Sequence, residues 1–257
     1  MPETSALDLY KGLFGVPSGD ALQVSGAVLG SLMSIPYENV SKILSPGLLR
    51  TPEVVMSGFA SRGLGGTCFS LTWLLRTVLS GLGVESRLCM ADRSYGENTH
   101  CALVLEFSGG LFLLDPGYLI FRPVRIQESG SSVFSFGAGV FNMDVSEGAA
   151  SVYSVVGGGD LKFRYRLRLG GVSEFVFFDC WKRSFSFAMM GCPVVSKYVD
   201  GRLVYLRGTR LQDGAGPARM LSPEGAASYL DSVGVSGADY LAALGASKGN
   251  VLCTRGS

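Results

Sequence analysis

The chain has 257 residues and a formal net charge of +1, and charged residues make up 17% of it against roughly 25% in a typical soluble domain. This near-neutral composition gives no indication of the basic surface that binds a nucleic acid or an anionic membrane. The chain has no apolar run near the roughly 18 residues of a membrane span, and its start lacks the features of a secretory signal, so we expect a cytoplasmic protein with no nucleic-acid or membrane partner.

The first predicted region, residues 1–83, is a helical domain. Its apolar residues recur at helical spacing, and proline and glycine breaks separate the segments. The breaks are at Pro17-Ser18-Gly19, Pro36, Pro46-Gly47 and Gly63 to Gly66. The last segment begins at Cys68 and continues to Leu79, with Thr67 as its expected N-cap.

The second region, residues 84–190, is strand-like, because short runs of β-branched and aromatic residues alternate with glycine-rich turns. We predict an antiparallel β-barrel or sandwich here. The predicted strands are Cys101–Phe107, Leu111–Leu114, Val152–Val156, Leu161–Leu169 and Val172–Phe178.

The third region, residues 191–257, mixes strands and helices. Val194–Val199 and Leu203–Leu206 flank Asp200-Gly201 and predict a hairpin. Two helices follow, Ser222–Leu230 with Ser222 as its N-cap, and Gly237–Leu244. The fold class is therefore α+β, in three consecutive regions.

The candidate chemistry centres on the one histidine, His100, and on Cys68 and Asp115. A cysteine nucleophile needs a base beside the thiol and a carboxylate that orients the imidazole. At the first turn of a helix, the N–H groups and the helix dipole favour the Cys68 thiolate. His100 starts one strand and Asp115 closes the next, about seven residues from the turn on either side, so a hairpin brings them together.

Each residue also has an ordinary structural interpretation. A lone histidine is often a plain core or surface residue, and a cysteine after two glycines is often a small buried hydrophobe. Asp115 before Pro116 is typical of a turn. The three residues in this order, two of them joined by a hairpin, favour the catalytic triad over these separate interpretations.

The six cysteines are scattered along the chain, and no pair is separated by two residues, so we expect free thiols in a reducing compartment. One histidine and dispersed cysteines also make no convincing zinc site, and we predict no metal. The six cysteines are Cys68, Cys89, Cys101, Cys180, Cys192 and Cys253.

The run Gly65-Gly66-Thr67-Cys68-Phe69, followed by His100 on a strand and by Asp115-Pro116-Gly117-Tyr118, resembles the arylamine N-acetyltransferase family. Ile35-Pro36-Tyr37-Glu38-Asn39 is similar to a segment that precedes the cysteine loop in that family, and residues 201–211 are loosely similar to its C-terminal part. The resemblance spans nearly the whole chain. It implies a helical bundle, a β-barrel and an α/β lid.

The resemblance also implies a ping-pong reaction in which Cys68 accepts an acyl group from acetyl-CoA or another acyl-CoA and passes it to a small-molecule amine. Tyr37 and Tyr118 are the candidate substrate-binding residues, with core packing as the alternative. Three positions depart from the family: Leu64 stands where it has arginine, Ser70 where it has glutamate and Thr72 where it has asparagine. These departures do not affect the three triad residues, but they leave the acyl donor and the acceptor undetermined. An acyl carrier protein is one alternative donor.

Two further interpretations stay open. The same triad suits an amide synthase or a transglutaminase- or protease-like hydrolase, and a non-catalytic binding protein could use the same scaffold. The stripe of Lys162, Arg164, Arg166 and Arg168 suits coenzyme A phosphates or a carrier protein, although we favour the solvated face of a half-buried barrel strand as its explanation.

Overall fold

The computed structural model describes residues 4–187 and 191–247, and the N-terminal part of this range is helical, as predicted. The helices end at the predicted breaks, and Ser5 and Asp20 cap the first two with side-chain hydrogen bonds. The helices are α1 (Ala6–Phe14), α2 (Ala21–Ser31), the 3-10 turn η1 (Leu32–Ser34), α3 (Val40–Leu44), α4 (Pro52–Arg62) and α5 (Cys68–Gly81).

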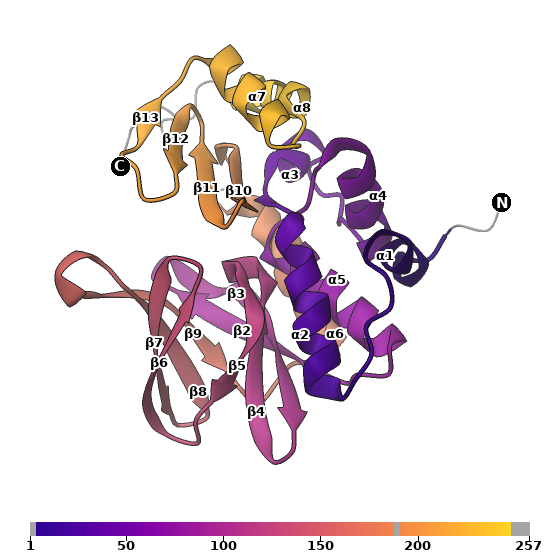
Figure 1. Cartoon of the computed structure of the whole chain (residues 1–257), viewed down its shortest axis with the longest axis vertical. Coiled ribbons are helices and arrows are strands. Elements are labelled where there is room, and N and C mark those ends of the chain that lie inside the picture. Colours follow the sequence, from indigo (N-terminus) through magenta and orange to yellow (C-terminus); the bar gives the residue numbers. More distant parts are fainter. Residues whose placement is uncertain (1–3, 188–190, 248–257) are drawn as a thin grey trace.

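An antiparallel sheet of eight strands forms a nearly closed barrel beside these helices (Figure 1). Its strand order is β5-β4-β3-β2-β9-β8-β7-β6. The strands are β2 (Arg87–Arg93), β3 (Gly96–Phe107), β4 (Gly110–Asp115), β5 (Ile120–Ile126), β6 (Gly130–Phe136), β7 (Gly139–Ser146), β8 (Ala149–Val155) and β9 (Leu161–Arg168), with 3-10 turns η2 (Pro116–Tyr118) and η3 (Gly157–Gly159).

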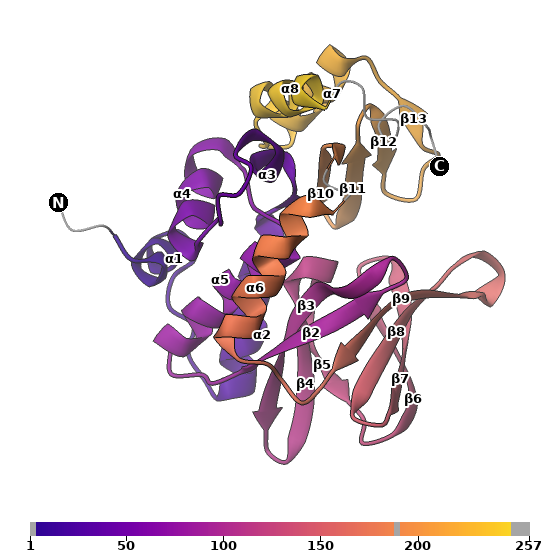
Figure 2. The same ribbon diagram turned by 180° about the vertical axis from the view of Figure 1, so that it is seen from behind.

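The segment predicted as a strand at Val172–Phe178 is instead the start of a helix, α6 (Glu174–Arg183), followed by the 3-10 turn η4 (Ser184–Ser186). The Ser173 side chain caps it by accepting a hydrogen bond from the Val176 N–H. Its buried residues, Phe177, Cys180 and Trp181, recur at helical spacing. α6 packs along α5 at the back of the molecule, where Phe177 and Trp181 contact Phe69 (Figure 2).

A second sheet, order β1-β10-β11-β12-β13, lies above the barrel in Figure 1. The predicted hairpin is confirmed as β10 and β11, and both predicted C-terminal helices are present, the first capped by the Ser222 side chain. The edge strand β1 comes from the N-terminal part and pairs with β10. The elements are β1 (Tyr37–Glu38), β10 (Val194–Val199), β11 (Arg202–Arg207), β12 (Arg210–Asp213), β13 (Arg219–Met220), α7 (Pro223–Ser232) and α8 (Gly237–Ala246).

Three apolar clusters hold these parts together. The first joins the helices to one face of the barrel, the second fills the barrel, and the third packs the second sheet against α3, α7 and α8. The chain is thus an α+β protein with a nearly closed antiparallel barrel, as predicted. Its division at residues 84 and 191 into three domains remains our proposal.

The described cysteines differ in state. Four are free, as expected, whereas Cys192 is disulfide-bonded, so the expectation of free thiols is wrong at that position. Cys253 lies outside the described residues. Within residues 4–187 and 191–247, the structure contains no helix long and apolar enough to cross a bilayer. The free cysteines are Cys68, Cys89, Cys101 and Cys180.

Candidate active site

Cys68 is the first residue of α5 and is 7% exposed. Thr67 occupies the N-cap position, as predicted, but its hydroxyl makes no capping bond and is buried without a hydrogen-bond partner. The first N–H groups of a helix have no intrahelical acceptor, and its dipole places partial positive charge there. The Cys68 sulfur therefore lies where a thiolate is favoured.

His100 lies on β3 and Asp115 ends β4, the two strands of the predicted hairpin. The His100 Nε2 and the Asp115 Oδ2 are 2.9 Å apart, and both side chains are completely buried. The pairing of Leu103 with Leu114, continued by one step, places Ala102 opposite Asp115. His100 and Asp115 are thus diagonal neighbours on one face of the sheet, two residues away from direct opposition.

The turn after Asp115 brings the hairpin against the first turn of α5. The Asp115 Oδ1 accepts a hydrogen bond from the Tyr118 N–H at 2.9 Å, which fixes the carboxylate and the η2 turn together. Gly117 lies so close to Cys68 that a Cβ on it would be 2.5 Å from the Cys68 Cβ and 3.2 Å from the His100 Cε1. Glycine is therefore required here for sulfur and imidazole to meet.

The electrostatics of this group favour an imidazolium–thiolate pair. Burial lowers the pKa of His100, but the charge and hydrogen bond of Asp115, together with Cys68, outweigh it and raise the pKa to about 9. Hydrogen bonds from Cys101 and His100, and the His100 charge, lower the pKa of Cys68 well below its ordinary value against the opposing effect of burial. Because Nε2 faces Asp115, the other ring nitrogen, Nδ1, is left for Cys68.

Two residues that the sequence analysis did not single out contribute to this state. Burial and the neighbouring Cys68 raise the pKa of Cys101, so its thiol stays protonated and donates to the Cys68 sulfur. Lys42 is 7% exposed, donates to the Ser184 Oγ, and its charge also lowers the pKa of Cys68. Burial lowers the pKa of Lys42 itself to about 8.

Both tyrosines predicted to bind substrate lie near the three residues. Burial raises the pKa of Tyr37, with further effects from Cys68 and Arg93. The Tyr118 ring meets His100 edge-on, with centroids 6.1 Å apart, and the Tyr165 and His100 ring centroids are 4.6 Å apart. Two aromatic rings therefore pack against the His100 imidazole, and the binding role of Tyr37 and Tyr118 remains a prediction.

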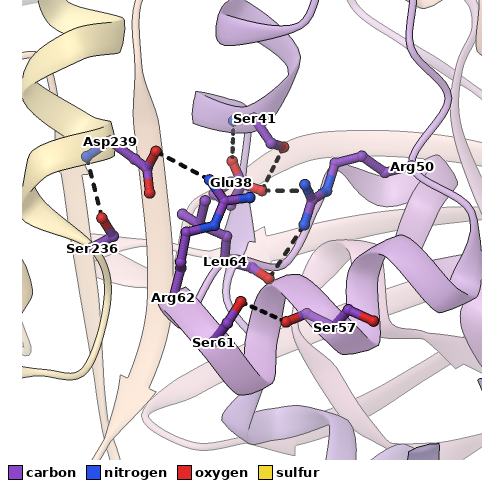
Figure 3. Close-up of polar contacts among 9 residues, drawn as sticks. All are labelled: Glu38, Ser41, Arg50, Ser57, Ser61, Arg62, Leu64, Ser236 and Asp239. Atoms are coloured by element: carbon purple, nitrogen blue, oxygen red, sulfur yellow. Dashed lines mark hydrogen bonds and ion pairs between the residues drawn. The ribbon is translucent and has the colours of Figure 1, made fainter.

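A buried polar network holds the loop that leads into Cys68 (Figure 3). The Arg50 guanidinium is 8% exposed; its Nε donates to the Gly65 carbonyl at 2.9 Å and lies 4.0 Å from the Glu38 carboxylate. Glu38 accepts hydrogen bonds from the backbone N–H and hydroxyl of Ser41 and donates its own N–H to the Gly66 carbonyl. Gly65 and Gly66, which precede Cys68, are therefore both tied to this network.

The three departures from the resemblance have distinct surroundings. Leu64 is buried in the third apolar cluster, and its carbonyl lies 3.5 Å from the Arg50 Nη2, so the guanidinium near this backbone comes from residue 50. Ser70 is buried within the first turn of α5. The Thr72 hydroxyl donates to the Cys101 carbonyl at 3.3 Å, which links α5 to β3.

Replacing Arg50 with methionine should destabilise the fold by about 3–5 kcal/mol, because it removes the cation beside the buried Glu38 carboxylate and leaves the Gly65 carbonyl without its donor. Arg62, which also appears in Figure 3, is the matched control: it forms a half-exposed ion pair with Asp239 at 3.3 Å, worth about 0–1 kcal/mol. Urea unfolding measures both variants. Equal losses in Arg50→Met and Arg62→Met would contradict the role of the buried network.

The basic stripe on β9 is engaged with neighbouring strands. The Arg164 Nε donates to the Ser154 Oγ, Arg166 lies 3.7 Å from the Glu147 carboxylate, and Arg168 donates to Asp92 and Asn98. The alternate side chains Tyr165 and Leu167 point into the barrel. This alternation is that of a half-buried barrel strand with a solvated face.

A helical part beside a nearly closed antiparallel barrel, with a second sheet above it, is the fold of solved arylamine N-acetyltransferases. The Salmonella typhimurium enzyme aligns with a TM-score of 0.77 at 17% identity, covering 95% of this chain and 99% of that one. A Mycobacterium marinum enzyme, solved in complex with CoA, aligns with a TM-score of 0.79 at 18% identity, covering 94% of this chain and 97% of that one. A Bacillus cereus enzyme described as having a Cys-His-Glu catalytic triad aligns with a TM-score of 0.71 at 17% identity, covering 91% of this chain and 99% of that one.

At the level of sequence, a model of the N-acetyltransferase family matches residues 26–161, just over half of the chain. The chain therefore belongs to the arylamine N-acetyltransferase family, as the resemblance implied, and its low identity to the solved structures makes it a divergent member. Comparison with curated protein sequences gives no match.

Proposed function

We propose that the protein is an acyltransferase that moves an acyl group from a thioester to an amine through an acyl-enzyme on Cys68. The observation that carries the proposal is the buried contact of His100 with Asp115 at 2.9 Å, beside a cysteine whose pKa is lowered well below its ordinary value. A thiolate, a base and an orienting carboxylate are the groups that nucleophilic acyl transfer requires. Membership of the N-acetyltransferase family supports the same chemistry.

In the first half-reaction, the Cys68 thiolate attacks the carbonyl carbon of the donor thioester. A carbon–sulfur bond to Cys68 forms as the bond to the donor sulfur breaks, and His100, protonated at neutral pH, can give its proton to the departing thiolate. Acetyl-CoA or another acyl-CoA is the proposed donor. The M. marinum relative solved with CoA supports that choice.

In the second half-reaction, an amine attacks the acyl-enzyme. The carbon–nitrogen bond forms, the bond to the Cys68 sulfur breaks, and His100 takes up the proton that the amine loses. Asp115 holds the imidazole in one orientation and stabilises its charged form throughout. An arylamine or hydrazine is the proposed acceptor, with Tyr37 and Tyr118 as proposed contacts of the substrate.

The proposal predicts a covalent acyl-enzyme intermediate that mass spectrometry can detect. Acetyl-CoA without an amine should add one acetyl mass to the protein, on Cys68, because exchange between two thioesters is nearly balanced and a buried site slows hydrolysis. An arylamine should then remove the added mass. Intact-mass spectrometry with peptide mapping measures both steps. Cys68→Ala should remain unmodified, and Cys180→Ala, which removes another buried free cysteine, should acylate normally.

Other outcomes identify the competing functions. Acylation by a longer acyl-CoA or a carrier-bound chain alone would change the donor and keep the mechanism, in agreement with the substituted positions Leu64, Ser70 and Thr72. If no thioester acylates Cys68 while Cys68 still reacts with iodoacetamide, acyl transfer is contradicted and the transglutaminase- or protease-like hydrolase is favoured. An unreactive Cys68 would favour the binding protein.

A further inference from the structure

Arg93, the last residue of β2, has an unusual environment for an arginine. Its Nε is buried without a hydrogen-bond partner, and within residues 4–187 and 191–247 no carboxylate forms an ion pair with its guanidinium. Arg87, at the other end of the same strand, pairs with the Glu106 carboxylate, and the buried Arg50 lies beside Glu38. A buried donor without an acceptor costs free energy, so this one is suited to a ligand that supplies it.

Aromatic rings surround the Arg93 guanidinium. Its central carbon lies 5.2 Å from the centroid of the Tyr95 ring and 5.9 Å from that of Tyr118. Burial is the main cause that raises the pKa of Tyr95, Tyr118 and Tyr37, so these phenols stay neutral and can donate hydrogen bonds. The rings therefore stabilise the cation through their faces and leave its positive charge without a partner anion.

Arg93 also lies close to the reaction centre. The Tyr118 ring contacts both the guanidinium and His100, and Arg93 interacts electrostatically with Cys68. The Cys68 thiolate is itself paired with the protonated His100. A substrate bound at Cys68 thus extends into the range of a cation that has no other anion among the described residues.

We propose that Arg93 binds a carboxylate on the substrate, so that the enzyme selects an acidic amine or an acidic acyl group. A guanidinium presents two parallel N–H donors that match the two oxygens of a carboxylate, and one guanidinium balances one negative charge. A phosphate carries up to two charges and is usually met by several cations. The assignment of a substrate class rests on the proposed acyl transfer. The first test below measures anion binding near Cys68 and does not depend on acyl transfer.

The first test compares two alkylating agents of nearly equal size. Iodoacetate carries a carboxylate and iodoacetamide carries a neutral amide, so the ratio of their rates at Cys68 reports an anion site beside the sulfur. The ratio also cancels any change in thiolate fraction, which affects both reagents alike. We expect the ratio to exceed that of free cysteine roughly tenfold or more, and Arg93→Gln to remove the excess.

Arg87→Gln is the matched control, since it removes an exposed arginine from the same strand. It should keep the wild-type ratio, and Arg93→Lys should keep part of it because the charge stays and the fork is lost. A melting temperature within a few degrees of wild type establishes that Arg93→Gln is folded. A ratio equal to that of free cysteine in the wild type, or one that Arg93→Gln leaves unchanged, overturns the proposal.

The second test locates the carboxylate. For the amine, kcat/KM for 4-aminobenzoate is compared with that for its methyl ester; for the acyl group, acylation of Cys68 by succinyl-CoA is compared with that by butyryl-CoA. Arg93→Gln should lower the acid-to-neutral ratio roughly tenfold to a hundredfold in one of the two pairs, which assigns the carboxylate to that substrate. If neither pair depends on Arg93, the substrate assignment fails. If no thioester acylates Cys68 at all, acyl transfer fails and the alkylation ratio still decides whether Arg93 binds an anion.

Discussion

Replacing His100 with glutamine is expected to slow alkylation of Cys68 by iodoacetamide at pH 6 by roughly a hundredfold or more. The thiolate is the reactive form, and His100 lowers the pKa of Cys68 through a hydrogen bond and its charge. Glutamine keeps the volume and polarity of the side chain but carries no charge. Burial, which raises the pKa of Cys68, then acts with less opposition, so the thiol stays protonated to higher pH.

The pH profile gives the sign of this effect directly. In the wild type, the thiolate–imidazolium pair is the main form from the lowered pKa of Cys68 up to the pKa of about 9 of His100. The labelling rate should therefore stay high as the pH falls to 6, whereas in His100→Gln it should fall at a higher pH. Labelling of Cys180 on α6 is the internal reference and should not change. Identical profiles for Cys68 in both proteins would disprove the pair.

The helices and the hairpin that carries His100 and Asp115 could be predicted because their signals are local. Proline and glycine breaks mark the ends of α1–α4, and the turn at residues 108–110 alone joins the two strands that carry His100 and Asp115. Ser108 and Gly109 adopt positive φ angles of 48° and 70°, which a tight hairpin turn requires. The exact register was missed: the turn pairs Phe107 with Gly110, which places His100 and Asp115 two residues out of direct opposition.

Two parts of the fold were missed for opposite reasons. α6 is rich in aromatic residues, and its composition favours a strand although the burial of Phe177, Cys180 and Trp181 follows a helical period. The barrel strands β2, β5, β6 and β7 lack a predicted counterpart, and in β6 Phe134 is the one buried residue. A strand with so little buried surface has a weak alternating pattern, and its place is determined by its neighbours in the barrel.

The residues around the nucleophile that were missed come from distant segments. Lys42, Arg50, Arg93 and Cys101 lie on four different elements or loops, and no motif joins any of them to Cys68. A single sequence shows that such residues exist but not that the fold brings them to one place. Leu64 illustrates the limit: its identity indicates a lost arginine, whereas the structure has Arg50 beside the same backbone.

Replacing Asp115 with asparagine is expected to slow acylation of Cys68 by roughly a thousandfold or more while the protein stays folded. The Asp115 Oδ2 accepts from His100 Nε2, and its Oδ1 accepts from the Tyr118 N–H. An asparagine can keep the second bond, but its amide group cannot stabilise a protonated imidazole, and an NH₂ group facing Nε2 forces the proton onto the ring nitrogen that must serve Cys68. The lost charge also removes the main cause that raises the pKa of His100.

Asp92 on β2 provides a control with the same bonding pattern away from the nucleophile, since it accepts from the Asn98 N–H and from Arg168. Asp92→Asn should lose some stability and keep its acylation rate within a few-fold of wild type. Stopped-flow acylation with the best thioester measures the rate, and circular dichroism with thermal melting confirms the fold of both variants. If Asp115→Asn acylates Cys68 as fast as Asp92→Asn does, the carboxylate does not orient His100 for catalysis, and the base must act without it.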